Sequence, residues 1–113
     1  MALKKEIESE NGISVNYHRI AAIQKITNIA NIIEVDSYVS EKKRKEEQAY
    51  QNAQQKRANN EQLTEEENKI LESGINVFVE AEYIKIDYSE GLTIKDAYNY
   101  LKSIEKYKNA IDI

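Results

Sequence analysis

His18 is the only histidine of the chain, and histidine is the side chain most often used as a general base near neutral pH. A catalytic base needs a nucleophile and an orienting group beside it, and no motif around His18 supplies them. The stretch 13–20 alternates apolar and polar residues like a half-buried strand, with His18 on the side away from Val15 and Tyr17. We therefore interpret His18 as a structural or exposed residue, and we expect no catalytic residue.

Metal and cofactor chemistry also lacks a signature in the sequence. The chain has no cysteine, its acidic residues do not follow calcium-loop spacing, and the Glu65–Glu67 cluster suits the start of a helix. Its three glycines, Gly12, Gly74 and Gly91, lie too far apart to form a phosphate-binding loop. We expect no metal, no cofactor and no enzymatic activity. An enzyme with a cryptic site remains an alternative, which loss of activity in His18→Ala would revive.

Tyrosine is the unusual residue of this chain, with eight copies against one phenylalanine and no tryptophan. Four of them, Tyr17, Tyr38, Tyr83 and Tyr88, fall in strand-like stretches. A tyrosine ring buries area while its hydroxyl keeps a hydrogen bond, which suits protein interfaces. We therefore take these four residues as interface candidates. Core packing is the alternative, and stacking on nucleic-acid bases or sugars is a weaker one.

The charge balance limits the classes of partner that we expect. Sixteen basic and 20 acidic residues give a net charge of −4, which argues against a general nucleic-acid binder. The basic run 42–45 is flanked by glutamates and is interpreted as a solvated helix face. No stretch approaches the ~20 apolar residues of a membrane span, and the amino-terminal residues show no secretion signal.

Strands are predicted in the first third of the chain. Residues 13–26 and 31–39 form an expected antiparallel pair, and 1–12 is a short lead-in that could pair with it before an Asn-Gly turn. Ile20, Ile23 and Ile26 recur every third residue, which predicts a distorted strand with a bulge near Arg19 or a bend. On the second strand, Ile33 and Val35 share one face.

Helices are predicted in the remainder, with one further strand. Ser40 caps a polar helix over 41–60, which is either an exposed helix or a mobile loop. Thr64 and Thr93 begin two capping boxes. Residues 75–88 form the strongest strand signal, with a change of phase near Tyr83 that suggests a bulge or burial on both faces. The closing helix carries an apolar stripe made of Ile94, Ala97, Tyr98, Leu101 and Ile104.

These elements predict an α+β fold. We expect an antiparallel sheet of three to four strands, packed by a C-terminal helix, with a polar helical excursion at about 41–72. Length is consistent with a single domain spanning 1–113. Its core is expected in two blocks, 13–40 and 75–107, separated by the excursion.

The order of these pieces resembles a known group of proteins. The pieces are Tyr-His-Arg-Ile (17–20), Ile-Ile-Glu-Val-Asp-Ser-Tyr-Val-Ser (32–40), a Lys/Arg/Glu run (41–47), the strand 75–88, Asp-Ala-Tyr-Asn-Tyr-Leu-Lys (96–102) and Lys-Asn-Ala-Ile-Asp-Ile (108–113). Together they resemble small tail- or baseplate-associated structural proteins of phages and prophages of Gram-positive bacteria. The resemblance implies a virion-associated protein that oligomerises and docks, and it implies no active site.

The sequence therefore supports two hypotheses. The first is a non-enzymatic phage or prophage structural or tail-accessory protein, whose partners are copies of itself and other phage structural proteins. It would lie in the virion or the bacterial host cytoplasm, with no nucleic acid, membrane or small-molecule substrate. The alternative is a small regulatory module that binds a protein partner through the charged helix 41–60.

Overall fold

The computed structural model describes residues 1–10, 12–73 and 79–113, and it confirms the α+β class. Within these ranges the sheet has five strands rather than the expected three to four. The elements follow in the order β1 (Leu3–Glu8), β2 (Ser14–Ile26), β3 (Ala30–Tyr38), α1 (Glu41–Ala58), α2 (Glu65–Ser73), β4 (Glu80–Asp87), α3 (Ile94–Ser103), a 3₁₀ turn (Glu105–Tyr107) and β5 (Ile111–Asp112).

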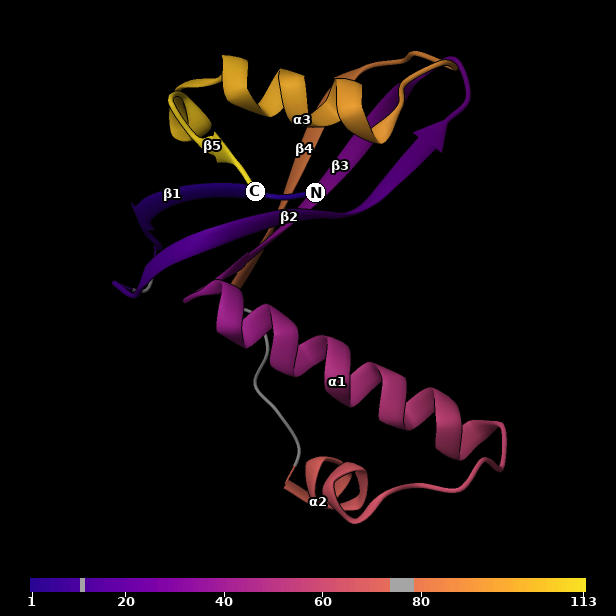
Figure 1. Ribbon diagram of the computed structural model, residues 1–113. Helices are drawn as coiled ribbons and strands as arrows, with labels where there is room; N and C mark the ends of the chain where they lie inside the picture. The colour runs from indigo at the N-terminus through magenta and orange to yellow at the C-terminus, as the bar shows by residue number, and fades with distance from the viewer. Residues whose placement is uncertain (11, 74–78) are drawn as a thin grey trace.

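The two ends of the chain lie side by side within the sheet (Figure 1). The strand order is β4-β3-β2-β1-β5, with every neighbouring pair antiparallel. Two backbone hydrogen bonds of 3.0 Å between Ala2 and Ile113 tie the termini together. Leu3 is fully buried in the main core cluster, so the core includes the lead-in strand and is not confined to the two expected blocks.

The distorted strand is confirmed in β2. Its register against β3 shifts between Ile20 and Ala22, where one extra residue enters the strand. Because of this bulge, Ile20 lies opposite Val35 and Ile23 lies opposite Ile33, so both isoleucines face the same core. The three-residue spacing in the sequence thus reflects a bulge and not a helix.

Helix α3 covers one face of the sheet. Its capping box is complete, because the Thr93 side chain accepts from the Asp96 backbone and the Asp96 side chain accepts from the Thr93 backbone. Ala97, Tyr98 and Leu101 of the predicted stripe are buried against the sheet. Ile94, in the first turn of the helix, is on the predicted stripe but is not buried, and it is 59% exposed.

Strand β4 differs from the predicted strand 75–88. The described strand is Glu80–Asp87, and residues 75–78 lie outside the described residues. It pairs with β3 over eight residues without a register shift, so the predicted bulge near Tyr83 is wrong within this range. The apparent phase change has another cause: Glu80 and Glu82 continue the half-buried face, and Tyr83 lies on the exposed face.

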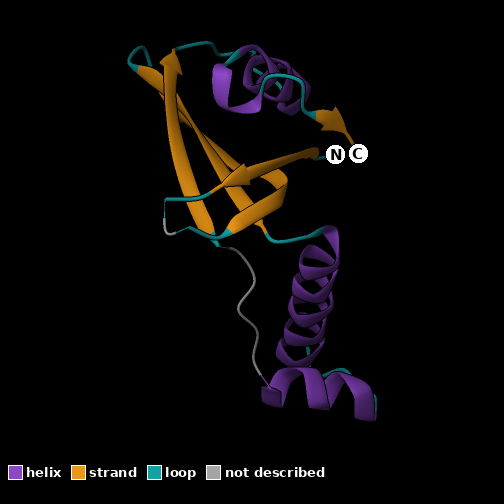
Figure 2. Ribbon diagram, turned by 90° about the vertical axis from the view of Figure 1, so that its left-hand side faces the viewer, coloured by secondary structure: helices purple, strands orange, loops and turns teal. Residues whose placement is uncertain are grey.

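The polar excursion is a helical hairpin made of α1 and α2, which projects from the sheet (Figures 1 and 2). It is inserted between β3 and β4, whose adjoining ends are joined by a hydrogen bond of 2.8 Å from the Val79 N–H to the Ser37 carbonyl. The Cα radius of gyration is 16.2 Å, against about 13 Å for a compact chain of this length. In α1 only Glu47 and Ala53 are buried. The hairpin therefore contributes little to the core.

Candidate interaction site

The four candidate tyrosines lie in very different environments. Tyr83 is 66% exposed on β4, whereas Tyr17 on β2 and Tyr88, just after β4, are half-buried. Tyr38 is fully buried, with its ring edge-on to that of Tyr17 at a centroid distance of 5.7 Å. Tyr38 is therefore corrected from an interface candidate to a core residue, because α1 covers the end of β3 that carries it. The surface candidates that remain are Tyr17, Tyr83 and Tyr88.

A buried carboxylate joins α1 to the sheet at this point. The Tyr38 hydroxyl donates to Glu47 Oε1 at 2.7 Å, and Arg44 of the same helix also donates to Glu47 Oε1. Arg19 of β2 donates from Nε to the Tyr38 hydroxyl at 3.1 Å and lies 4.0 Å from Glu47 Oε1. Burial raises the pKa of the Tyr38 hydroxyl to about 12, so it stays a donor at neutral pH. We call these four residues the Glu47 network.

Asp36 lies beside the Glu47 network, opposite Arg19 in the sheet, and is only 5% exposed. One of its oxygens, Oδ1, is buried and has no hydrogen-bond partner in the described part of the chain. Burial, together with the neighbouring Glu34 carboxyl, raises the pKa of Asp36 to about 7, and the opposing effect of Arg19 is smaller. Near neutral pH this carboxyl is therefore only partly ionised.

His18 lies on the opposite face of β2 from Arg19 and is fully buried. Its Nε2 lies 2.7 Å from the Lys5 carbonyl oxygen, which can only accept, so Nε2 carries the proton. Its Nδ1 then accepts from the Ser37 hydroxyl, also at 2.7 Å. Burial lowers the pKa of His18, so the ring is neutral near pH 7. Both nitrogens are occupied and shielded from solvent, which gives His18 a structural role.

A second charged cluster closes the same side of the sheet. Lys106 forms ion pairs with Glu82 at 2.8 Å and with Glu80 at 3.2 Å, and the Tyr107 hydroxyl donates to Glu82 at 2.9 Å. Although burial opposes it, these two carboxylates raise the pKa of Lys106. The Tyr107 ring lies edge-on to His18 with centroids 5.4 Å apart. The cluster fixes the 3₁₀ turn against β4, which explains why glutamates occupy the inward face of that strand.

The exposed face of β4 is the most accessible part of the sheet. Ala81, Tyr83, Lys85 and Asp87 alternate along it, and each is exposed. It continues the face that carries Glu34 and Asp36 on β3, and α1 contacts that face at Tyr38 and Arg19, at one end of the sheet. β4 is also the last strand of the sheet among the described residues. This strand thus presents both an open face and a free backbone edge.

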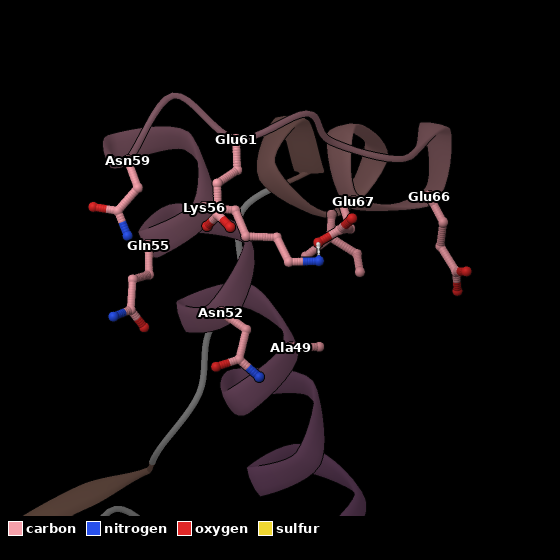
Figure 3. A pocket seen from close by; sticks show the side chains of 9 residues that line it. Ala49, Asn52, Gln55, Lys56, Asn59, Glu61, Glu66 and Glu67 are labelled. Carbon is pink, nitrogen blue, oxygen red and sulfur yellow. Dashed lines mark ion pairs between the residues drawn. The ribbon is translucent and has the colours of Figure 1, made fainter.

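A groove of about 550 Å³, lined by both polar and apolar side chains, separates the two helices of the hairpin (Figure 3). Asn52 and Gln55 of α1, with Asn59 just after it, line one side, and Glu66 of α2 lines the other. The two helices are joined by an ion pair of 3.0 Å between Lys56 and Glu67. Exposed amides and one partly exposed ion pair give the groove hydrogen-bonding groups, and Ala49 and Ile70 add apolar contacts.

The described ranges contain no group of three or more His, Asp or Glu side chains placed to hold a metal ion. Among the same residues, no helix combines the length and hydrophobicity needed to cross a bilayer.

Comparison of the chain with protein-family models, with curated proteins and with solved structures gives no match. The case for function therefore depends on the geometry of this chain and on the motif order described above.

Sequence reasoning did not single out the Glu47 network. Its members were divided between a strand pattern that held Arg19 and a charged run that held Arg44 and Glu47. The spacing of three between Arg44 and Glu47 does predict a helical ion pair. The sequence carried no signal that this pair would meet Tyr38, because that contact depends on where α1 docks.

Proposed function

We propose that this chain is a non-enzymatic structural or tail-accessory protein of a phage or prophage, which acts through self-association and docking to other virion proteins. The observation that carries the proposal is the free edge of β4, with Tyr83 exposed beside it. An unpaired edge strand offers backbone donors and acceptors to a further strand. The motif order supports the assignment to phage tails.

A second copy of β4 is a suitable partner for this edge. Antiparallel pairing about a two-fold axis at Ile84 places Tyr83 of each copy opposite Lys85 of the other. The two residues can then form a cation–π contact across the new interface. The same register places Ile84 opposite Ile84 of the second copy. A single edge therefore supplies a self-complementary surface, as a two-fold dimer requires.

Light scattering after size-exclusion chromatography, over a range of concentrations, tests self-association. We expect the wild-type chain to form dimers or larger oligomers, and Tyr83→Glu to shift the equilibrium toward monomer. Tyr100→Glu is the matched control, since Tyr100 is a partly exposed tyrosine on α3. A wild-type chain that stays monomeric at millimolar concentration would refute the self-association proposal.

The chain has no cysteine, which permits a test of the register. In the proposed dimer, Ile84→Cys places two thiols on directly opposed residues, within disulfide range. We expect this variant to form a covalent dimer under mild oxidation, and Lys69→Cys on α2 to remain monomeric. Equal cross-linking of the two variants would argue against this register.

Docking to other virion proteins has its own test. We expect the chain to be present at a fixed copy number in purified particles released by induction of the prophage that carries its gene, as quantified by mass spectrometry. Its absence from such particles, with the protein present in the lysate, would contradict the virion assignment.

The alternative is a small regulatory module that uses helix 41–60 as its contact surface. The projection of α1 and α2 away from the sheet favours it, because ordered helices that bury little of the core have no evident role within the chain. The adjoining ends of β3 and β4 allow residues 39–78 to be replaced by an Asn-Gly hairpin turn. The structural proposal expects self-association to survive this change, whereas the alternative expects loss of partner binding only.

A further inference from the structure

A cavity of about 310 Å³ lies where β2, α1 and α3 meet, and it is separate from both the β4 edge and the groove between α1 and α2. Arg19 and Tyr17 line it from β2, Arg44 and Gln48 from α1, and Ile94 and Tyr98 from α3. We infer that this cavity binds a carboxylate group carried on a small apolar body. The two arginines would hold the carboxylate, and the apolar side chains of the opposite wall would hold the apolar part.

The cavity carries a surplus of positive charge. Arg19 and Arg44 are 22% and 13% exposed at their side chains, and within the described residues their ion pairs involve only Glu47. Two guanidiniums facing one carboxylate leave one positive charge uncompensated. Asp36, opposite Arg19, offsets only part of it, because its pKa of about 7 leaves it partly protonated near neutral pH.

Among the residues that the structure describes, the donors of the two arginines are also incompletely used. In the Glu47 network, Arg19 donates through Nε and Arg44 through Nη1, which leaves guanidinium N–H groups at both residues for another acceptor. A guanidinium fork matches the two oxygens of a carboxylate, and limited exposure strengthens such a bond. One surplus charge balances a monoanion better than a phosphate dianion. The site therefore favours a carboxylate over a phosphate.

The opposite wall of the cavity is apolar. Ile94 is 59% exposed at this wall, although its helix buries the rest of its stripe. The Tyr98 hydroxyl accepts from the Ile20 N–H at 2.9 Å and donates to the Met1 carbonyl at 2.8 Å. Tyr98 is only 3% exposed, so it offers the cavity little of its ring, and Ile94 and Met1 supply most of the exposed apolar surface. An aromatic or branched aliphatic group would cover Ile94 and Met1.

Nuclear magnetic resonance titration of the intact chain tests the inference with benzoate as the probe. We expect saturable binding, with the largest shifts at the Ile94 methyl groups and the Tyr17 ring. The neutral isostere benzamide and inorganic phosphate should bind about tenfold or more weakly. A tripeptide ending in phenylalanine, with a free or an amidated terminus, shows whether a protein terminus can supply the carboxylate.

Replacing an arginine would disturb the Glu47 network, so the test variant is Gln48→Glu. Gln48 is exposed, lines the cavity and is outside that network. The added carboxylate should weaken benzoate binding about tenfold, without changing the fold. Gln54→Glu, at an exposed position on the same helix, is the matched control and should bind like the wild type. Benzamide or phosphate binding as tightly as benzoate, no saturable binding, or equal effects of the two variants would overturn the inference.

Discussion

Replacing Glu47 with alanine tests the link between the helical hairpin and the sheet. The Glu47 residue is 4% exposed, and its carboxylate accepts from the Tyr38 hydroxyl at 2.7 Å and from Arg44. The alanine variant leaves the hydroxyl without this acceptor and leaves two partly buried guanidiniums, those of Arg19 and Arg44, without their counter-charge. We expect this to be the most destabilising single change in the hairpin.

The expected loss follows from these contacts. A hydrogen bond to a buried charge contributes about 1.5–3 kcal/mol, and breaking a fully buried ion pair costs about 3–5 kcal/mol. Water can reach the arginines, whose side chains are 22% and 13% exposed, and this reduces the second contribution. We therefore expect the free energy of unfolding to fall by about 2–3 kcal/mol, which lowers the melting temperature by about 10 °C for a chain of this size.

Two measurements check this prediction. Thermal and urea unfolding followed by circular dichroism give the loss of stability, and hydrogen exchange shows where the loss is localised. Because α1 buries little besides Glu47 and Ala53, we expect exchange to rise first over Glu41–Ala58 and to stay slow in β3. Glu47→Gln, which keeps one acceptor oxygen, should lose less stability.

Glu46→Ala is the matched control for Glu47→Ala. Glu46 is the preceding residue of the same helix, and it pairs with Lys43 on the surface at 3.3 Å. A surface pair of this kind contributes roughly 0–1 kcal/mol. If Glu47→Ala were no more destabilising than Glu46→Ala, or if α1 stayed protected, Glu47 would not be the anchor of the hairpin.

Three further predictions concern two buried ionisable residues and two helix caps. Because burial raises the pKa of Asp36 from 3.8 to about 7, the free energy of unfolding should fall as pH rises from about 4 to about 7. At pH 8, Asp36→Asn should be more stable than the wild type by about 1–2 kcal/mol. A difference in urea midpoint between the two proteins that does not change with pH would contradict this prediction. Because burial lowers the pKa of His18 from 6.5, its contribution to the free energy of unfolding is present above pH 6.5 and is lost as pH falls below that value. His18→Asn should remove this part of the pH dependence. If the variant lost stability below pH 6.5 as steeply as the wild type, the prediction would be wrong. Thr93→Ala should lower the free energy of unfolding measured in urea by about 1 kcal/mol, because Thr93 caps the helix that covers the core. Thr64→Ala should loosen only α2 and leave this free energy nearly unchanged. Equal losses in the two variants would show that the hairpin is not energetically separate from the core.

Much of the local structure could be predicted because it depends on neighbours in the sequence. The capping boxes at Thr64 and Thr93 need only residues three positions apart, and both form. Alternation predicted β2 and β3. The isoleucine spacing predicted a distorted strand with a bulge near Arg19 or a bend, and the structure has the bulge between Ile20 and Ala22. These signals are reliable where one face of a strand is buried, since burial then selects the residue at every second position.

The prediction was less accurate where the burial of a side chain depends on a partner that is distant in the sequence. In β4 the apolar residues Ala81 and Tyr83 resemble a buried face, yet they are exposed, while Glu80 and Glu82 are turned inward. The reason is Lys106, whose two ion pairs compensate the inward carboxylates. A pattern of hydrophobicity along one strand does not contain that partner.

Taken alone, the sequence determined the class of fold, the position of the helical excursion between the strands, and the nature of its surface. These properties follow from composition, periodicity and capping, each of which acts within a few residues. The position of Leu3 in the main core, the pairing of β5 with β1 and the burial of Tyr38 depended on the folded chain. His18, where the search for chemistry began, is held between the Lys5 carbonyl and the Ser37 hydroxyl. Its role was decided by two neighbouring strands, because only the sheet brings those two oxygens to its ring.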